Sequence, residues 1–384
     1  MASYLTGVDT TVHPEDEMLL NAMAGIPNKG LARAVYFRQG HEINSTLQEL
    51  LDWACAGDKR NAKVLEFACG YGRATRFLVA QVNPRNVWAS DIYAGAVEFQ
   101  RKQFGVNGFV SCHEPSELAC DETFDLIFVA SLFTHLPRHR FEQWLARLFQ
   151  MLSPRGVLAF SVHDETLVAG RAMPEDGYLF VKASESRSLD LDEYGSTYVT
   201  EGYMSGAIAR VIGAGAHWHY KRLPLALCGA HDMYLVARDP TQDFSTLVHV
   251  QPPVGYVERF GVTPGGALTV AGWAAEHDLT ERVENISVSV DGRVRATARP
   301  DIDRPDVVQV LGKASFLRSG WLVSLRNLPP SRHGSKAVEV TVTSSSGRSA
   351  ILHSSALSDA AMEPEPPAAP GLVSRVLTAL RKPA

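Results

Sequence analysis

Apolar runs and helical patterns alternate through the middle of the chain. Short apolar runs predict buried strands at residues 64–65, 87–89, 109–110, 126–130 and 157–162. Apolar positions spaced as on one helical face predict intervening helices at residues 75–82, 94–104 and 140–152. Repeated β-α units are typical of a parallel sheet covered by helices on both faces. Residues 61–240 are therefore expected to form a doubly wound α/β domain.

Two less regular segments flank these repeats. Residues 1–60 are expected to be a helical lead-in, in which the run 44–46 (Asn-Ser-Thr) offers N-cap side chains for a helix toward Trp53. Residues 163–240 contain Gly-rich and polar stretches and are interpreted as an insertion followed by the last strands. The run 231–237 is the expected final strand, because Asp239-Pro240 ends it.

The second half of the chain changes to alternating apolar and polar positions. The runs 286–290 and 338–342 have a period of two, which is typical of half-buried strands. Asp291-Gly292 lies between two such runs and predicts a β-hairpin. Residues 254–358 are expected to form an all-β sandwich. A Pro- and Ala-rich linker with a short amphipathic tail, which offers weak contact with a membrane or partner, is expected at residues 359–384.

The composition is that of an ordinary globular protein. Of 384 residues, 45% are hydrophobic, and 37 basic against 42 acidic side chains leave a formal net charge of −5. This length predicts two or three domains. The basic residues are scattered along the chain, so the sequence does not favour a nucleic-acid partner.

Membrane, secretion and cysteine signals are weak. No apolar run approaches the ~18 residues of a membrane-spanning helix, and the N-terminus shows no secretory pattern, so a cytoplasmic location is expected. Five cysteines without a C-x-x-C pair disfavour a disulfide framework or a structural zinc site. No resident metal is expected, although Asp164 and Glu165 beside His163 leave a divalent cation open.

The most informative segment is V-L-E-F-A-C-G-Y-G-R-A-T, residues 64–75. It passes from a strand through a Gly-rich turn into a helix, and Gly70 and Gly72 allow a ligand to approach the backbone closely. A dinucleotide fingerprint needs Gly or Ala where Thr75 stands, so an oxidoreductase is disfavoured. Glu66, at the end of the strand, can face a cationic amine or order the loop.

A second acidic residue follows about one β-α unit later. Asp91 ends the predicted strand at 87–91, the position from which a carboxylate can accept both hydroxyls of a ribose. Either acid alone can equally be a cap or a solvated loop residue. Their combination and spacing favour a binding site.

These residues resemble the class I S-adenosylmethionine-dependent methyltransferases, whose fold is Rossmann-like. The resemblance runs from residue 64 to 163 in its motifs, with Ala68 in place of the usual first glycine. Segments 124–136 and 152–163 look most like methyltransferases of bacterial cell-surface glycan pathways. The β-rich half, with Gly-Trp motifs at Trp273 and Trp321, resembles sandwich modules appended to glycan-modifying enzymes. Either tryptophan can stack on a sugar, but core packing is the commoner role.

The resemblance implies S-adenosyl-L-methionine as the cofactor. It places the following residues around it: Glu66, Ala68, Gly70, Gly72, Asp91, Glu114 and Ser131. Glu114 stands in for an aspartate that the family has near the adenine amine, and His113 is the alternative neighbour.

Two histidines are candidates for a general base. His135 follows the fourth predicted strand and His163 the fifth, so both belong at the carboxyl edge of the sheet. A sugar hydroxyl is a poor nucleophile until it loses its proton, and a histidine base contributes ~10²–10⁴-fold to such a step. Each can instead serve only to hydrogen-bond the backbone. His231-Asp232 is a weaker candidate pair.

The sequence thus predicts a methyltransferase that O-methylates a sugar hydroxyl of a surface polysaccharide or its precursor. The acceptor is expected to be a small molecule or a glycan. The alternative is a non-catalytic glycan-binding or scaffold protein that retains the fold.

Overall fold

The computed structural model describes residues 3–26, 29–55, 58–168, 170–184, 186, 189–212, 219–249, 251–262, 267–276, 282–326, 328, 336–345 and 347–362. The chain divides into two compact units. Of the described residues, those within 7–21 and 39–249 form the α/β unit, and those within 3–6, 22–38 and 251–362 form the β unit. Residues 1–60, expected as a separate lead-in, are divided between both units. Residues 363–384 lie outside the described residues, and with them the expected amphipathic tail.

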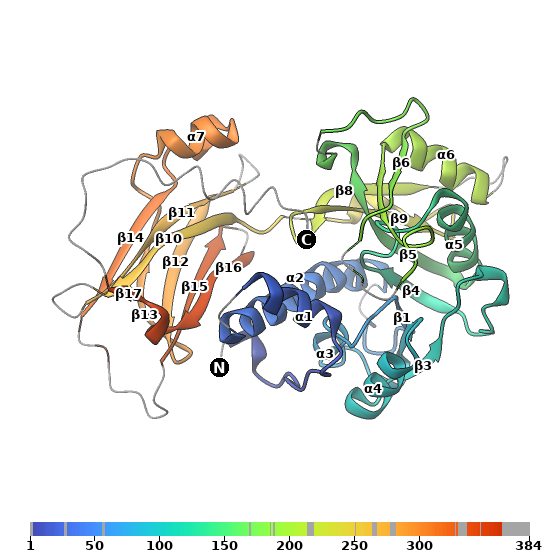
Figure 1. Ribbon diagram of the computed structural model, residues 1–384, viewed down its shortest axis with the longest axis horizontal. Coiled ribbons are helices and arrows are strands. Elements are labelled where there is room, and N and C mark those ends of the chain that lie inside the picture. Colours follow the sequence, from blue (N-terminus) through green and yellow to red (C-terminus); the bar gives the residue numbers. More distant parts are fainter. Residues whose placement is uncertain are drawn as a thin grey trace. The chain divides into compact units, whose positions relative to one another are not determined.

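The α/β unit is built on one mixed sheet (Figure 1). Its strands follow in the order β3 (Asn107–Val110), β2 (Val87–Asp91), β1 (Val64–Phe67), β4 (Phe124–Val129), β5 (Leu152–Asp164), β7 (Ser196–Val199) and β6 (Tyr178–Val181). The strands from β3 to β7 are parallel to their neighbours. The antiparallel strand β9 (His231–Ala237) pairs with β5 and with β8 (Tyr220–Leu227). The predicted Rossmann-like α/β fold is confirmed.

Helices cover both faces of this sheet. The α-helices of the first 249 residues are α1 (Glu17–Gly25), α2 (Lys29–Ala54), α3 (Thr75–Leu78), α4 (Ala94–Phe104), α5 (Arg138–Gln150) and α6 (Glu201–Ile212). Alternate residues of β4 point to opposite cores: Leu126 packs with the second half of α2, and Ile127 packs with α5 and α6. The parallel strands are buried on both sides, as their continuous apolar runs indicate.

The predicted helix start at 44–46 is wrong. Helix α2 begins at Lys29, and residues 44–46 lie inside it. Instead of capping, the Thr46 hydroxyl donates a hydrogen bond to the carbonyl of Ala226 at 2.6 Å. A capping residue inside a longer helix finds another acceptor, and sequence spacing alone does not reveal this.

The β unit contains two four-stranded sheets. One follows the order β14 (Gly320–Leu325), β11 (Leu268–Ala275), β10 (Val254–Val262) and β17 (Ala361–Met362). The other follows β13 (Arg293–Ala298), β12 (Val283–Val290), β15 (Ala337–Ser344) and β16 (Ser349–Ala356), and α7 (Pro305–Leu311) also belongs to this unit. Apolar side chains of both sheets share one core. The predicted β-rich module is confirmed.

Two local predictions in this unit are borne out. Asp291-Gly292 has φ angles of 51° and 73° and joins the antiparallel strands β12 and β13. Both φ values are positive, as a type I′ hairpin turn requires. Trp273 and Trp321 are 5% and 1% exposed, so both indoles belong to the core and neither offers a face to a sugar.

Among the described residues, no helix is long and apolar enough to cross a membrane.

Candidate functional site

The loop after β1 has an unusual backbone. Ala68, Gly70 and Gly72 have φ angles of 57°, 54° and 79°. A Cβ on Gly72 would lie 2.5 Å from Cε2 of Phe104, so only glycine fits there. A Cβ on Gly70 would meet nothing within 4 Å, so space stays open beside that residue. The loop therefore offers bare backbone to a ligand at the carboxyl end of β1.

Asp91, the last residue of β2, fixes this loop. Its Oδ2 accepts the N–H of Gly70 at 2.8 Å, and its Oδ1 accepts the N–H of Tyr93 at 3.0 Å. The side chain of Gln100 holds the same loop by donating to the carbonyl of Gly70 at 2.7 Å. Burial raises the pKa of Asp91, although both backbone donors oppose that shift. A carboxylate oxygen accepts more than one hydrogen bond, so capacity for hydroxyl donors remains.

Glu66 is buried in β1, two residues before Ala68 of the loop. Its Oε2 accepts the hydroxyl of Thr75 at 2.6 Å, and the residue is only 4% exposed. Burial raises the pKa of Glu66 to about 7. Both predicted acids therefore lie at the edge of the same loop, and a cationic ligand group would favour the ionised form of Glu66.

An N-terminal segment crosses the loop, which the sequence did not indicate. Arg76, 1% exposed, donates to the carbonyls of Asp9 and Thr11, both at 2.9 Å, and its Nε donates to the carbonyl of Gly72 at 2.9 Å. The ring of His13 stacks on that of Tyr71, with centroids 4.4 Å apart. One buried guanidinium thus joins residues 9–11 to the Gly-rich loop.

The two remaining cofactor candidates have different surroundings. Glu114 follows β3, and both of its carboxylate oxygens bind Arg140, one at 2.5 Å. Its alternative, His113, is exposed. Ser131 follows β4 with a φ of 67°, and its N–H donates to the hydroxyl of Ser161 at 2.8 Å. Contact of Glu114 or Ser131 with a cofactor stays a prediction. For Glu114, it requires the carboxylate to bind the cofactor and Arg140 at the same time.

His135 and His163 lie close together and are held alike. Nδ1 of His135 is 2.7 Å from the carbonyl oxygen of Gly195, and Nδ1 of His163 is 3.1 Å from that of Thr197. A carbonyl only accepts, so each Nδ1 carries the proton, and in the neutral ring each Nε2 is the unprotonated nitrogen. The ring centroids are 6.3 Å apart. The insertion containing β7 thus orients both candidate bases.

Aromatic rings cover these buried histidines. Tyr194 stacks on His135 with centroids 4.4 Å apart, and Tyr198 stacks on His163 at 5.1 Å. His231 lies edge-on to His163 at 4.6 Å. The structure therefore brings all three histidines into one row at the ends of β4, β5 and β9. Their shared location was predictable, but the covering tyrosines were not, because they come from the irregular insertion.

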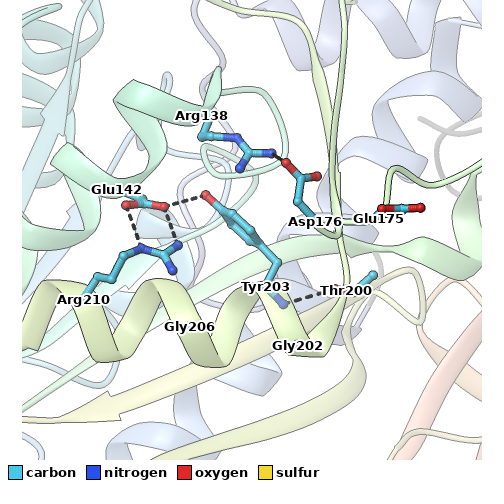
Figure 2. A pocket seen from close by; sticks show the side chains of 9 residues that line it. All are labelled: Arg138, Glu142, Glu175, Asp176, Thr200, Gly202, Tyr203, Gly206 and Arg210. Atoms are coloured by element: carbon cyan, nitrogen blue, oxygen red, sulfur yellow. Dashed lines mark hydrogen bonds and ion pairs between the residues drawn. The ribbon is translucent and has the colours of Figure 1, made fainter. Parts of the chain in front are cut away.

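A cleft of about 450 Å³ is lined by Arg138, which lies three residues after His135 in the chain (Figure 2). Arg138 and Glu142 of α5 form one wall, and Gly202 and Gly206 of α6 form another. Arg138 contacts Asp176 at 2.5 Å. No residue predicted from the sequence to act lines this cleft.

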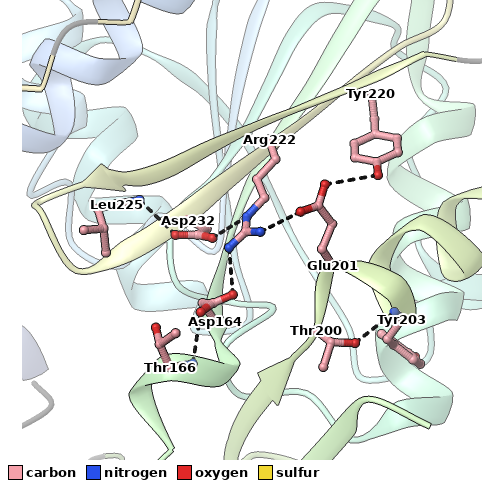
Figure 3. Close-up of polar contacts among 9 residues, drawn as sticks. All are labelled: Asp164, Thr166, Thr200, Glu201, Tyr203, Tyr220, Arg222, Leu225 and Asp232. Atoms are coloured by element: carbon pink, nitrogen blue, oxygen red, sulfur yellow. Dashed lines mark hydrogen bonds and ion pairs between the residues drawn. The ribbon is translucent and has the colours of Figure 1, made fainter. Parts of the chain in front are cut away.

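A second polar cluster, the Arg222 cluster, consists of Arg222, Asp164, Asp232 and Glu201 (Figure 3). The guanidinium binds Asp164 at 2.8 Å, Asp232 at 2.7 Å and Glu201 at 2.6 Å. It thus joins the residues that follow His163 and His231 in the chain. Arg222 occupies the carboxylate of Asp164, and within the described part of the chain no three His, Cys, Asp or Glu residues are grouped to hold a metal.

Comparisons with known proteins find similarity to methyltransferases. Residues 64–156 match the family model of a methyltransferase domain. Malonyl-[acyl-carrier protein] O-methyltransferase of Acetivibrio thermocellus is 26% identical over 134 residues, 33% of this chain and 43% of that protein. The enzyme of the same name from Calditerrivibrio nitroreducens is 28% identical over 102 residues, 27% of this chain and 38% of that protein. The chain spans less than half the length of these curated relatives.

Solved structures of methyltransferases are also similar. The DhpI complex with S-adenosylhomocysteine is 20% identical, with a TM-score of 0.37, covering 58% of this chain and 96% of that one. The glycopeptide N-methyltransferase MtfA with S-adenosylmethionine is 18% identical, with a TM-score of 0.36, covering 50% and 92%. The family-model match thus covers residues 64–156, which hold β1 to β4 and the start of β5 of the Rossmann-like sheet.

Proposed function

We propose that the protein is an S-adenosylmethionine-dependent methyltransferase that O-methylates a sugar hydroxyl of a surface polysaccharide or its precursor in the cytoplasm. The observation that carries the proposal is the bond between Asp91 and Gly70, inside the segment that matches a methyltransferase domain. It brings a buried carboxylate and open backbone to one edge of the sheet.

The residues of this edge suit the parts of the cofactor. Gly70 and Gly72 leave the backbone bare, Asp91 offers oxygens to ribose hydroxyls, and Glu66 offers a buried carboxylate to a cationic amine. When bound, S-adenosylmethionine supplies an already activated sulfonium methyl group. The chain must then hold the acceptor in line with that group, which is a demand on geometry.

Two histidines are oriented to take the proton of the acceptor. His135 and His163 each donate Nδ1–H to a carbonyl of the segment 195–197, which leaves Nε2 as the basic atom. We assign His135 as the first candidate and His163 as the second. Nε2 would take the hydroxyl proton as the acceptor oxygen bonds to the methyl carbon and the methyl–sulfur bond of the cofactor breaks.

The sugar acceptor rests on resemblance in the segments 124–136 and 152–163. The curated relatives are named for methylating malonyl-acyl-carrier protein, and one structural neighbour is named for glycopeptides. These names indicate that O- and N-acceptors of several kinds suit related domains. A glycan hydroxyl is the acceptor that this chain's own motifs favour.

Titration calorimetry tests the proposal directly. The full chain is titrated in parallel with S-adenosylmethionine, S-adenosylhomocysteine and a nicotinamide dinucleotide. Micromolar binding of the first two alone is expected, followed by methyl transfer to glycan precursors in a radiolabel assay. Binding of the dinucleotide instead would overturn the proposal, and cofactor binding with no transfer to any precursor would favour the non-catalytic alternative.

A further inference from the structure

The cleft between α5 and α6 has a charge pattern that limits its ligand (Figure 2). Its lining contains two arginines and three carboxylates. Glu142 contacts Arg210 through two nitrogens, at 2.7 and 3.3 Å, and the hydrogen bond from Arg210 lowers the pKa of Glu142. The lining is therefore net negative and its arginines are already paired. An anionic ligand would meet repulsion, and an apolar ligand would leave these polar groups desolvated.

The same groups suit hydroxyls. A guanidinium has five N–H donors, and the contacts drawn in Figure 2 use one nitrogen of Arg138 and two of Arg210. Carboxylates lie beside them, including that of Glu175, and a carboxylate oxygen is a hydrogen-bond acceptor. Donors and acceptors fixed next to one another match a ligand whose hydroxyls both donate and accept.

The floor of the cleft is open because α6 carries glycines there. A Cβ on Gly202 would come no closer than 3.8 Å to its nearest neighbour, the hydroxyl of Thr200, and one on Gly206 would meet only the guanidinium end of Arg210 at 3.1 Å. Packing therefore does not require either glycine. Glycine is also unfavourable inside a helix. Two glycines one turn apart, facing a cleft of about 450 Å³, keep space free for a ligand.

The chain segment from His135 to Arg138 connects the candidate base to the wall of the cleft. The carbonyl of Leu136, which follows His135, accepts the hydroxyls of Tyr178 and Thr197, both at 2.5 Å. Helix α5 and its Arg138 begin two residues later. Bonds to one short segment thus position both His135 and a wall of the cleft.

From these observations we infer that the cleft binds an uncharged, hydroxyl-rich sugar residue of the acceptor, adjoining the residue that is methylated. That this sugar residue belongs to a methyl acceptor rests on the proposed function. The binding itself rests on the cleft alone, so the two can fail separately.

The test measures binding to the full chain by saturation-transfer NMR. The ligands are the neutral methyl glycosides of glucose, galactose, mannose and rhamnose. The methyl glycoside of glucuronic acid serves as the anionic comparison. We expect millimolar binding of at least one neutral glycoside, weakened at least tenfold in Gly202→Leu and Gly206→Leu. Ser205→Leu places the same leucine side chain on α6 outside the lining and should bind as the original protein does.

Folding is controlled by thermal unfolding of each variant. Leucine favours a helix more than glycine does, so both cleft variants should unfold at the original temperature or above it. If either variant fails to fold, the backbone amide shifts of Gly202 and Gly206 in the original protein replace it, and they should move on titration with the bound glycoside.

Three results would overturn the inference. They are no binding of any neutral glycoside, tighter binding of the glucuronide, and unchanged binding in folded variants of both glycines. If the protein binds the cofactor and transfers the methyl group but binds no glycoside, only the inference about the cleft is overturned. If the protein binds a glycoside but not the cofactor, the proposed function is overturned and the inference that the cleft binds a sugar stands.

Discussion

The Asp91 carboxylate accepts the backbone N–H of Gly70 at 2.8 Å and so joins the end of β2 to the loop after β1. The two residues lie 21 positions apart in the sequence, Gly70 after β1 and Asp91 at the end of the neighbouring parallel strand β2. One buried side chain therefore both shapes the bare loop and offers oxygens to a ligand beside it.

Asp91→Ala should abolish measurable affinity for S-adenosylmethionine. The variant loses the proposed ribose contact and the bond that holds Gly70. Titration calorimetry measures the loss, and circular dichroism checks that the variant is folded. Asp91→Asn keeps one acceptor oxygen and should retain weak binding; affinity unchanged in the alanine variant would remove Asp91 from the site.

His135→Ala should keep cofactor binding and slow methyl transfer by ~10²–10⁴-fold, the usual contribution of a general base. His219→Ala removes an exposed histidine and should leave the rate unchanged. Single-turnover assays with a glycan precursor provide the rates. Full activity of His135→Ala would show that the bond from His135 to Gly195 is purely structural.

Glu66 should make both stability and cofactor affinity depend on pH. Burial raises its pKa to about 7 in the folded protein, against its ordinary value of 4.5. The folded state holds the proton more tightly, so this residue's contribution to the free energy of unfolding falls as pH rises from about 4.5 to about 7, by roughly 3 kcal/mol. Denaturant unfolding across this range should show the fall, and Glu66→Gln should lack it.

Cofactor affinity should change in the opposite direction. Above pH 7 the ionised Glu66 can pair with a cationic amine, so binding should be tighter at pH 8 than at pH 6. Calorimetry at both pH values measures this. An identical pH dependence in Glu66→Gln would place its origin elsewhere.

Arg222→Met should destabilise the α/β unit by about 3–5 kcal/mol, because it leaves Asp164 and Asp232 without their guanidinium partner. Those carboxylate side chains are only 11% and 3% exposed. The matched variant Lys102→Met removes an exposed helical ion pair with Glu98 and should change nothing measurable. Equal denaturation midpoints for both variants would contradict the structural role of Arg222.

Local patterns predicted much of the α/β sheet. Helix α4 and strand β9 have the expected bounds, because each combines a clear apolar period with a clear stop signal. The expected helix at 75–82 shortens to α3, four residues long. Short helices depend on tertiary packing more than on pattern, so their ends are poorly specified by sequence.

The predicted site residues gather at one edge because the carboxyl ends of parallel strands meet there, which topology alone predicts. The contacts that orient them come from distant segments. Arg76 reaches back to Asp9, and Gly195 holds His135 across 60 positions. Such pairings leave no periodic signal in the sequence. The contact of the N-terminal segment with the loop and the hydrogen bonds that orient the histidines could therefore not be predicted.

The hydrogen bonds that the two histidines donate to the carbonyls of Gly195 and Thr197 show that two different parts of the α/β unit build the candidate site. The loop after β1 and the end of β2 belong to the strand repeats, whereas the backbone that aims both imidazoles belongs to the insertion at β7. Replacing residues 165–200 would therefore re-aim both basic nitrogens while leaving the Asp91–Gly70 pair intact. Under the proposed function, exchanging this insertion would alter the acceptor side of the site and leave the proposed cofactor side unchanged.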